Sequence, residues 1–279
     1  MLAVKKFARD LPAVLGLLIV LAALVLASFP GLFVEDIAQV NRGNILYRLQ
    51  PPGEQFLFGT DDLGRDIFAR VILGTRSALI IAVVVVMFSM LVGVPLGLLA
   101  GYLGGIWSGA IMRVTDVFLA VPQLILAIAI AQILGRGAES AMIALAATYW
   151  PFFTRTVFAE TQRVRSMLFI EALEGLGASR ARIMLLHILP NIAAPVIVRA
   201  TVGMGFVILT AAVLGFLGVG ATPPDPDWGL AISQGRKYLP EQWWYATFPG
   251  LAILILVLGF NLLGDGIRDL VDPRLRRSR

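Results

Sequence analysis

The chain has 279 residues and a formal net charge of +5; 58% of its residues are hydrophobic and 15% are charged. Soluble domains are roughly half apolar and a quarter charged, so this composition, with a mean hydropathy of +0.84, excludes an ordinary soluble protein. The basic residues are scattered over short loops and ends, which argues against a nucleic-acid partner. With no cysteine and one histidine, His187, there is no basis for disulfides or Cys/His zinc sites. We predict an all-α membrane protein.

Six segments contain the run of about 20 predominantly apolar residues that a membrane-spanning helix needs. In chain order they are residues 12–29, 78–101, 117–134, 140–157, 194–219 and 247–264. The fourth segment is the weakest of the six, because it carries Pro151 and Arg155 near its end. The sequence therefore predicts six transmembrane helices.

The first apolar segment follows Lys5, Lys6 and Arg9, a pattern that also occurs in secretory signal peptides. Its apolar run of about 18 residues exceeds the usual signal-peptide core of about 7 to 15 residues. This length favours a retained anchor over a cleaved leader.

Lysine and arginine are more numerous in the loops that lie on the same side as the N-terminus than in the opposite loops. The positive-inside rule then places both termini in the cytoplasm, including the short segment 1–11. Residues 30–77 and 220–246 become external segments, and residues 78–279 form the core with the five later spans. The longest cytoplasmic loop is residues 155–193.

That cytoplasmic loop contains the stretch FIEALEGLGASRARIMLLHILPN, residues 169–191. Apolar residues recur at helical spacing from Phe169, while Glu171 and Glu174 lie on the other side of the predicted helix. Gly177 permits a left-handed turn, and Ser179 is a suitable N-cap for a second helix. We expect two helices that meet at a corner.

Two interpretations of this corner stay open on the residues alone. A rigid protrusion transmits force from a soluble partner into the flanking spans, whereas an amphipathic helix of the same composition lies on the lipid headgroups. Pro190 excludes an ordinary hydrogen-bonded helix interior at its position but is compatible with the first turn of the next span.

Glu171-Ala172-Leu173, followed after three residues by Gly177 and after nine more by His187-Ile188-Leu189-Pro190-Asn191, resembles the EAA loop of binding-protein-dependent ABC transporter permeases. The chain departs from the common pattern at Leu173 and His187. Residues 58–79, 113–135 and 249–276 resemble, in the same order, segments of the C-type subunits of dipeptide, oligopeptide and nickel importers. The resemblance covers roughly residues 57 to 276.

The resemblance implies a type I ABC importer permease fold with a cytoplasmic coupling helix in a prokaryotic plasma membrane. It also implies that an ATPase subunit contacts five residues of the loop, namely Glu171, Ala172, Glu174, Gly177 and Ala178. The implied partners are a B-type permease subunit in a heterodimer, two ABC ATPases that bind ATP and magnesium, an extracytoplasmic substrate-binding protein and membrane lipid. The chain itself has no G-x-x-x-x-G-K-[ST] loop, so we expect a non-enzymatic subunit without a cofactor or metal of its own. Peptide is the first candidate substrate, with nickel and other solutes open.

Two other classes of membrane protein are alternatives. A secondary transporter usually carries ionisable coupling residues within its spans, and here Arg199 is the only strong charge well inside a predicted span. An intramembrane enzyme needs a constellation such as H-E-x-x-H or paired aspartates within its spans, and the predicted spans contain neither.

Four further groups of residues have a structural and a functional interpretation. Asp61, Asp62, Arg65 and Asp66 are expected to form a turn, an N-cap and local ion pairs, with contact to a binding protein or to substrate as the alternative. Arg113 and Asp116, at i and i+3, are expected to pair with each other, with a gate function as the alternative. His187 is expected to be packed or interfacial, with a pH-sensitive contact as the alternative. Glycines are expected to allow close helix packing, with hinges as the alternative, at positions 93, 97, 101, 203 and 205.

Overall fold

The computed structural model describes residue 7 and residues 10–37 and 40–271. The predicted orientation used charged residues at the extreme N-terminus and in the arginine-rich tail after residue 271. Both segments lie outside the described residues. The helices are α2 (Leu11–Ser28), α3 (Ile67–Leu103), α4 (Gly105–Ala120), α5 (Gln123–Leu134), α6 (Ala138–Arg165), α7 (Leu168–Gly175), α8 (Arg180–Arg182), α9 (Leu189–Phe216), α10 (Trp228–Gly235) and α11 (Trp244–Val271).

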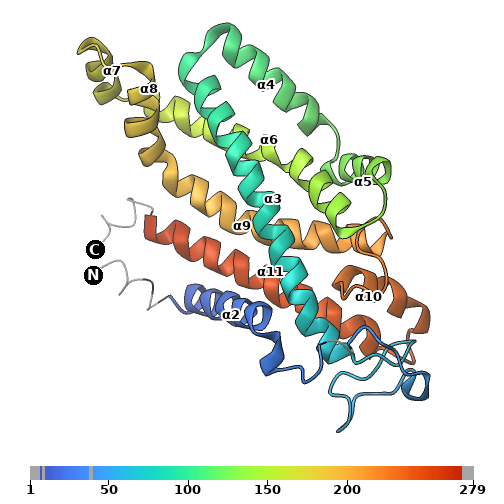
Figure 1. The fold of residues 1–279 in the computed structure, drawn as a ribbon. Coiled ribbons are helices and arrows are strands. Elements are labelled where there is room, and N and C mark those ends of the chain that lie inside the picture. Colours follow the sequence, from blue (N-terminus) through green and yellow to red (C-terminus); the bar gives the residue numbers. More distant parts are fainter. Residues whose placement is uncertain (1–6, 8–9, 38–39, 272–279) are drawn as a thin grey trace.

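The long helices form a bundle in which α3 crosses α6, α9 and α11 (Figure 1). Within the described ranges the only strand-like pairing is an isolated bridge between Thr60 and Asp66, so the predicted all-α fold is confirmed. Four helices are long and apolar enough to cross a membrane, namely α2, α3, α11 and the continuous helical run Arg180–Phe216. The pair α4 and α5 supplies a fifth if it is one bent span. The remaining predicted span, residues 140–157, falls on α6, which is not among these candidates and carries Arg155, Glu160 and Arg163 in its second half.

The prediction of one helix over residues 117–134 is wrong. Helix α4 ends at Ala120, α5 begins at Gln123, and the two are bent by 87°. Proline has no backbone N–H and disfavours helical geometry in the residue before it. Accordingly Val121, which precedes Pro122, is extended at φ −92° and ψ 131°.

Helix α3 is longer than the apolar run at 78–101 indicates, because its first turn is capped outside that run. The Asp66 side chain accepts a hydrogen bond from the Phe68 backbone N–H at 2.9 Å, and the helix ends before Gly104 at φ +68°. Its 37 residues make a rod of about 55 Å, which exceeds the apolar thickness of about 30 Å. The segment between α2 and α3 is correspondingly shorter than expected.

Helices α3 and α6 approach so closely that three glycines of α3 have no room for a side chain. A Cβ atom on Gly93 would lie 2.6 Å from the Phe153 Cβ, one on Gly97 2.7 Å from the Thr154 carbonyl oxygen, and one on Gly101 2.6 Å from the Thr161 Cβ. The four-residue spacing places these glycines on one face of α3. The structure therefore supports packing, as in small-xxx-small contacts, over hinging.

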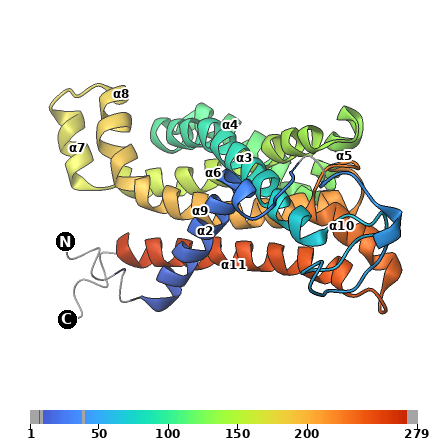
Figure 2. The same cartoon turned by 60° about the horizontal axis from the view of Figure 1, so that its bottom comes forward.

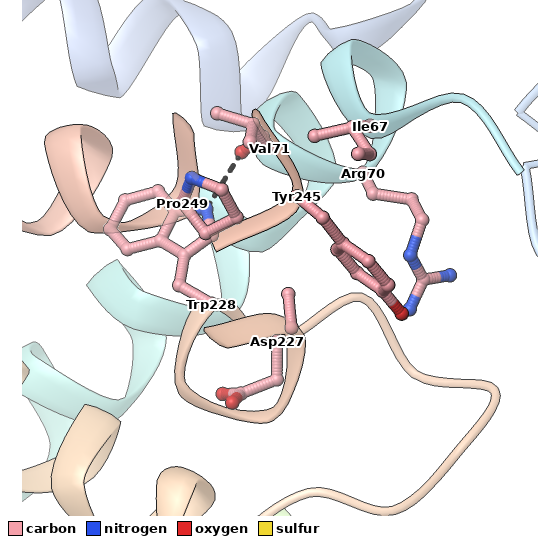
Figure 3. A pocket seen from close by; sticks show the side chains of 8 residues that line it. Ile67, Arg70, Val71, Asp227, Trp228, Tyr245 and Pro249 are labelled. Atoms are coloured by element: carbon pink, nitrogen blue, oxygen red, sulfur yellow. Dashed lines mark hydrogen bonds between the residues drawn. The ribbon is translucent and has the colours of Figure 1, made fainter. Parts of the chain in front are cut away.

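Helix α10 is fixed against the first turns of α3 (Figure 3). The indole Nε1 of Trp228 donates a hydrogen bond to the Val71 carbonyl oxygen at 3.0 Å, and the Tyr245 hydroxyl donates to Asp62 at 2.9 Å. Burial raises the pKa of Asp227, whose carboxylate caps α10 by accepting from the Leu230 N–H at 2.8 Å. The cavity of about 10 Å³ left among these residues is too small for a substrate.

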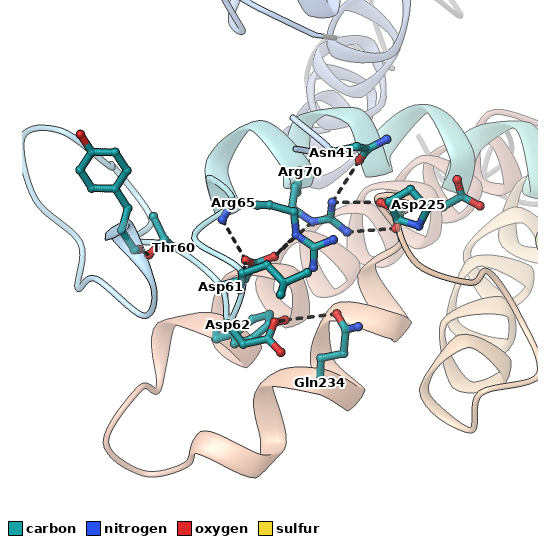
Figure 4. Close-up of polar contacts among 12 residues, drawn as sticks. Asn41, Thr60, Asp61, Asp62, Arg65, Arg70, Asp225 and Gln234 are labelled. Atoms are coloured by element: carbon teal, nitrogen blue, oxygen red, sulfur yellow. Dashed lines mark hydrogen bonds and ion pairs between the residues drawn. The ribbon is translucent and has the colours of Figure 1, made fainter. Parts of the chain in front are cut away.

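A buried ion-pair network joins the loop before α3 to the loop before α10 (Figure 4). The Asp61 carboxylate lies 2.6 Å from the Arg65 Nε, and both side chains are almost fully buried. Arg70 donates to the side-chain oxygen of Asn41 at 3.2 Å and to the backbone carbonyl oxygens of Pro224 at 3.1 Å and Asp225 at 3.0 Å. The structure thus favours the expected turn, N-cap and local ion pairs for this segment.

The two ends of the bundle differ in character (Figures 1 and 2). At one end α7 and α8 project from the bundle, and the start of α2 and the end of α11 lie at this same end. At the opposite end lie α10 and the loop that leads into α3.

The α3–α6 contact predicts that Gly97→Ala destabilises the protein by about 1 to 3 kcal/mol, because the new methyl group meets a backbone oxygen that cannot move alone. The matched control is Gly109→Ala in α4, where a Cβ meets nothing within 4 Å. Thermal unfolding in detergent, followed by tryptophan fluorescence, measures both changes. A melting temperature for Gly97→Ala equal to that of Gly109→Ala would contradict the packing role.

Candidate functional site

The projecting segment is anchored to the bundle by the apolar face of α7. Ile170 is 1% exposed and packs in a buried cluster with Val164 of α6 and with Ile183 and Ile188 from the turns before α9. Leu173, one helical turn after Ile170, packs against the same cluster. The helix therefore has one side fixed to α6 and to the start of α9.

Helix α7 ends in a hydrogen-bonded corner. The Gly177 N–H donates to the Glu174 carbonyl oxygen and the Ala178 N–H to the Leu173 carbonyl oxygen, both at 3.0 Å. This is the Schellman pattern, and its apolar contact is present because Leu173 and Ala178 pack on the same cluster. Gly177 has φ +76°, while a Cβ at this position would meet nothing within 4 Å. The requirement for glycine here is thus conformational, as the sequence predicts.

The chain leaves the corner as a second helix that continues without interruption into α9. The Ser179 hydroxyl caps this helix by accepting a hydrogen bond from the Arg182 N–H at 3.4 Å, as expected. Residues 183–188 form a π-helical turn in which the Leu189 N–H donates to the Met184 carbonyl oxygen. The wider turn accommodates Pro190, which stands in the first turn of α9 and has no N–H to donate. His187 in this turn is half-buried.

A side-chain contact ties α7 to the C-terminal end of α3. The hydroxyl of Tyr102 donates a hydrogen bond to the Glu174 carboxylate at 2.8 Å, and the Arg165 guanidinium lies 5.4 Å from the centre of the Tyr102 ring. Helices α3, α6 and α7 therefore meet around one aromatic ring. A hollow of about 320 Å³ beside this contact is lined by Tyr102, Leu103, Arg165, Glu174, Ala178 and Arg180.

The five predicted contact residues occupy two kinds of position. Glu171, Ala172 and Gly177 are exposed, and Glu171 has no hydrogen bond or ion pair with another described residue. Glu174 is exposed but engaged with Tyr102, and Ala178 is half-buried in the corner. The structure brings all five onto one projection.

Three features of the structure do not follow from the sequence patterns. Leu168 and Leu176 are 82% and 83% exposed, so the projection presents apolar side chains beside its carboxylates. Tyr102 lies at the end of the long apolar run of α3. An aromatic residue at that position is typical of an anchor at the membrane–water interface, so its contact with α7 is not predicted by the sequence. The expected Arg113–Asp116 pair is absent, because Asp116 pairs with Arg155 of α6.

The projection has the composition of a docking surface. Among the described residues no group of three or more histidine, cysteine, aspartate or glutamate side chains converges to hold a metal ion. An exposed carboxylate, flanking leucines and a fixed corner suit the insertion of a short helix into a groove of a partner.

The Tyr102–Glu174 contact predicts that Tyr102→Phe loosens α7 without unfolding the bundle, since the ring stays under Arg165. A hydrogen bond to a partly solvated carboxylate contributes about 1 kcal/mol, so amide exchange in α7 is expected to be roughly fivefold faster. Hydrogen–deuterium exchange measures this rate, and Tyr47→Phe at the opposite end serves as the control. Unchanged exchange in α7 would mean that the hydroxyl does not hold the helix.

Comparison with known proteins identifies the family. Residues 93–277 match the family described as the binding-protein-dependent transport system inner membrane component. The chain is 42% identical to the dipeptide transport system permease protein DppC of Alkalihalophilus pseudofirmus over 98% of this chain and 90% of the relative. It is 42% identical to the probable D,D-dipeptide transport system permease protein DdpC of Escherichia coli over 93% of this chain and 86% of the relative.

The fold has a counterpart among solved structures. A chain of the MetNI methionine ABC transporter in an inward-facing conformation superposes with a TM-score of 0.61 and 20% sequence identity, covering 74% of this chain and 98% of that chain. The type I ABC importer permease fold predicted from the sequence is thereby confirmed. The family assignment supports ABC import over the secondary-transporter alternative and is consistent with a non-catalytic subunit. The chain therefore belongs to the binding-protein-dependent transport system inner membrane components, as a multi-pass permease subunit of an ABC importer.

Proposed function

We propose that the projection formed by α7, the Gly177 corner and α8 is the coupling element of this permease and docks in a groove of an ABC ATPase. The observation that carries the proposal is the combination of a solvated contact face with an anchored opposite face. Glu171 and Leu176 are free to meet a partner, while Ile170 is buried against the bundle. A displacement imposed on the exposed face is thus passed to the helices.

Three connections would carry such a displacement into the bundle. Ile170 packs against α6, Tyr102 links Glu174 to the end of α3, and the second arm of the corner continues directly into α9. Because all three helices are among the longest in the chain, a movement of α7 changes the tilt of the bundle rather than the shape of a loop. This supports force transmission over a helix that only lies on headgroups.

The proposed orientation places the projection in the cytoplasm, where ATP is available. The start of α2 and the end of α11 lie at the same end of the bundle, in keeping with the basic residues near both ends of the chain. The buried network around Asp61 and Arg70 then lies at the extracytoplasmic end, where a substrate-binding protein would dock.

The functional unit we propose is a heterodimer of this chain with a B-type permease, together with two ATPases that bind ATP and magnesium. The substrate class we propose is short peptides. This rests on relatives named as dipeptide, D,D-dipeptide and di/tripeptide permeases that are similar over nearly the whole chain.

The orientation predicts that a Ser179→Cys variant is not labelled by a membrane-impermeant thiol reagent added outside intact cells. The same reagent is expected to label the variant in inverted vesicles, because Ser179 is exposed at the projection. The chain has no native cysteine, so the wild type is the background control. Labelling from outside would reverse the topology and remove the coupling role.

Coupling predicts that Gly177→Asp abolishes ATP-dependent peptide uptake while the protein still inserts and assembles. The matched control is Gly218→Asp. Gly218 has φ +77°, ends α9 in the same hydrogen-bonded pattern and has open space around its Cβ, but lies at the other end of the bundle. Each change costs about 1 kcal/mol of left-handed strain, so a difference between them reports location.

Uptake is measured with the complete transporter in proteoliposomes, with the binding protein on the outside. Equal uptake by the two aspartate variants would contradict coupling through the corner. Failure of the wild-type complex to import any peptide, while it hydrolyses ATP, would remove the peptide assignment and leave the coupling role standing.

A further inference from the structure

Arg199 of α9 stands out among the described arginines by the surroundings of its guanidinium. Its Nε is buried without a hydrogen-bond partner, and none of the ion pairs among the described residues includes it. Arg199 itself is half-buried, and the two fully buried arginines differ from it: Arg65 and Arg70 each bind a carboxylate or carbonyl oxygens. An unpaired arginine inside an apolar helix is costly and marks a functional position.

The guanidinium of Arg199 is held over two aromatic rings of α6. Its central carbon lies 5.2 Å from the centre of the Phe152 ring and 5.9 Å from that of Tyr149. Tyr149 is 2% exposed, and its hydroxyl fills the space beside Gly203, where a Cβ would approach to 2.7 Å. The platform is therefore rigid. Stacking on a ring face leaves donors at the edge of a guanidinium free to bind a carboxylate with two hydrogen bonds.

The surface next to this platform is also polar and also within the bundle. Arg155 lies one turn after Phe152 on α6 and forms an ion pair with Asp116 of α4, with both side chains about half exposed. At 1.5 Å per residue, Arg155 lies about 15 Å before the end of α6. A hollow of about 480 Å³ on α4 is lined in part by Asp116 and Arg113.

Charged side chains do not face lipid tails without a large cost, so the exposed Arg155–Asp116 pair faces water, a partner subunit or lipid headgroups. Arg113 lines the hollow with Asp116, and Arg155 lies one turn after Phe152, over which Arg199 is held. The one carboxylate of Asp116 is thus outnumbered by arginines, and Arg113 and Arg199 have no acidic partner among the described residues, which favours an anionic occupant.

We propose that Arg199, on its Tyr149–Phe152 platform, binds the terminal carboxylate of the transported peptide in the inner part of the translocation path. This rests on the proposed peptide transport and names the group of the substrate that the permease itself recognises. Arg113 and Arg155 supply the surrounding positive potential. The interaction is transient, because a solvated carboxylate leaves once the path opens to the cytoplasm.

The test compares a peptide with its C-terminal amide in the complete transporter, reconstituted with the binding protein outside. The peptide and its amide are chosen so that the binding protein binds both with equal affinity and delivers both equally to the permease. Arg199→Gln is expected to lower the maximal uptake rate of the free acid roughly tenfold and to leave the amide within about twofold, because a charge-assisted hydrogen bond is lost for the acid only. Arg199→Lys is expected to recover much of the rate, since the charge is restored.

The matched control is Arg236→Gln. The Arg236 guanidinium also lies over a ring, 4.8 Å from the centre of Phe216, which is the last residue of α9. This substitution is expected to leave the acid-to-amide ratio unchanged. ATP hydrolysis by the complex without peptide is measured for each variant to verify assembly.

Three outcomes would overturn the proposal. One is a wild-type complex that imports acid and amide at equal rates, and another is an Arg199→Gln variant that keeps the wild-type ratio. The third is an Arg199→Gln variant that fails to assemble or hydrolyse ATP, which would assign Arg199 to a carboxylate of the partner permease or a lipid phosphate. A wild-type complex that hydrolyses ATP but imports no peptide would instead show that the peptide assignment had failed, and the carboxylate site with it, while the coupling role would stand.

Discussion

The structure depends on the close crossing of α3 and α6, which brings two backbones together where Gly93, Gly97 and Gly101 carry no side chains. Apolar side chains gain little from contact with each other in a membrane, because lipid is equally apolar, so close van der Waals packing must hold the helices. Helix α6 carries Tyr149, Phe152 and Arg155 three residues apart, so each is a neighbour of the next along the helix surface. Both the platform for Arg199 and the anchor of α7 involve this pair of helices.

Local chemistry made part of the fold predictable. The Gly177 corner, the Ser179 cap and the cap of α3 by Asp66 each involve hydrogen bonds within a few residues, which sequence patterns report directly. The apolar runs located the long helices because hydropathy is also a property of consecutive residues. The break at Pro122 was missed because a run of apolar residues continues across it, and hydropathy does not register an 87° bend.

Contacts between distant segments were not predictable from spacing. Asp116 has Arg113 one turn away, yet it pairs with Arg155 on another helix, since the crossing of α4 and α6 decides which guanidinium is closer. Tyr102 and Glu174 are 72 residues apart, and only the tertiary fold brings them within 2.8 Å. The EAA-like motif identified the projection, whereas the leucines that flank its carboxylates became visible only as exposed area.

Helix α3 connects the two ends of the molecule, because Arg70 in its first turn holds the loops before α3 and α10, and Tyr102 in its last turn holds α7. Energetic coupling between two sites is reciprocal: a ligand that favours one arrangement of a shared element at one end alters affinity at the other end by the same factor. A ligand bound at these loops and a ligand bound at the projection would therefore act on the same helix. Occupancy of one end would then change the state of the other end even before any solute moves.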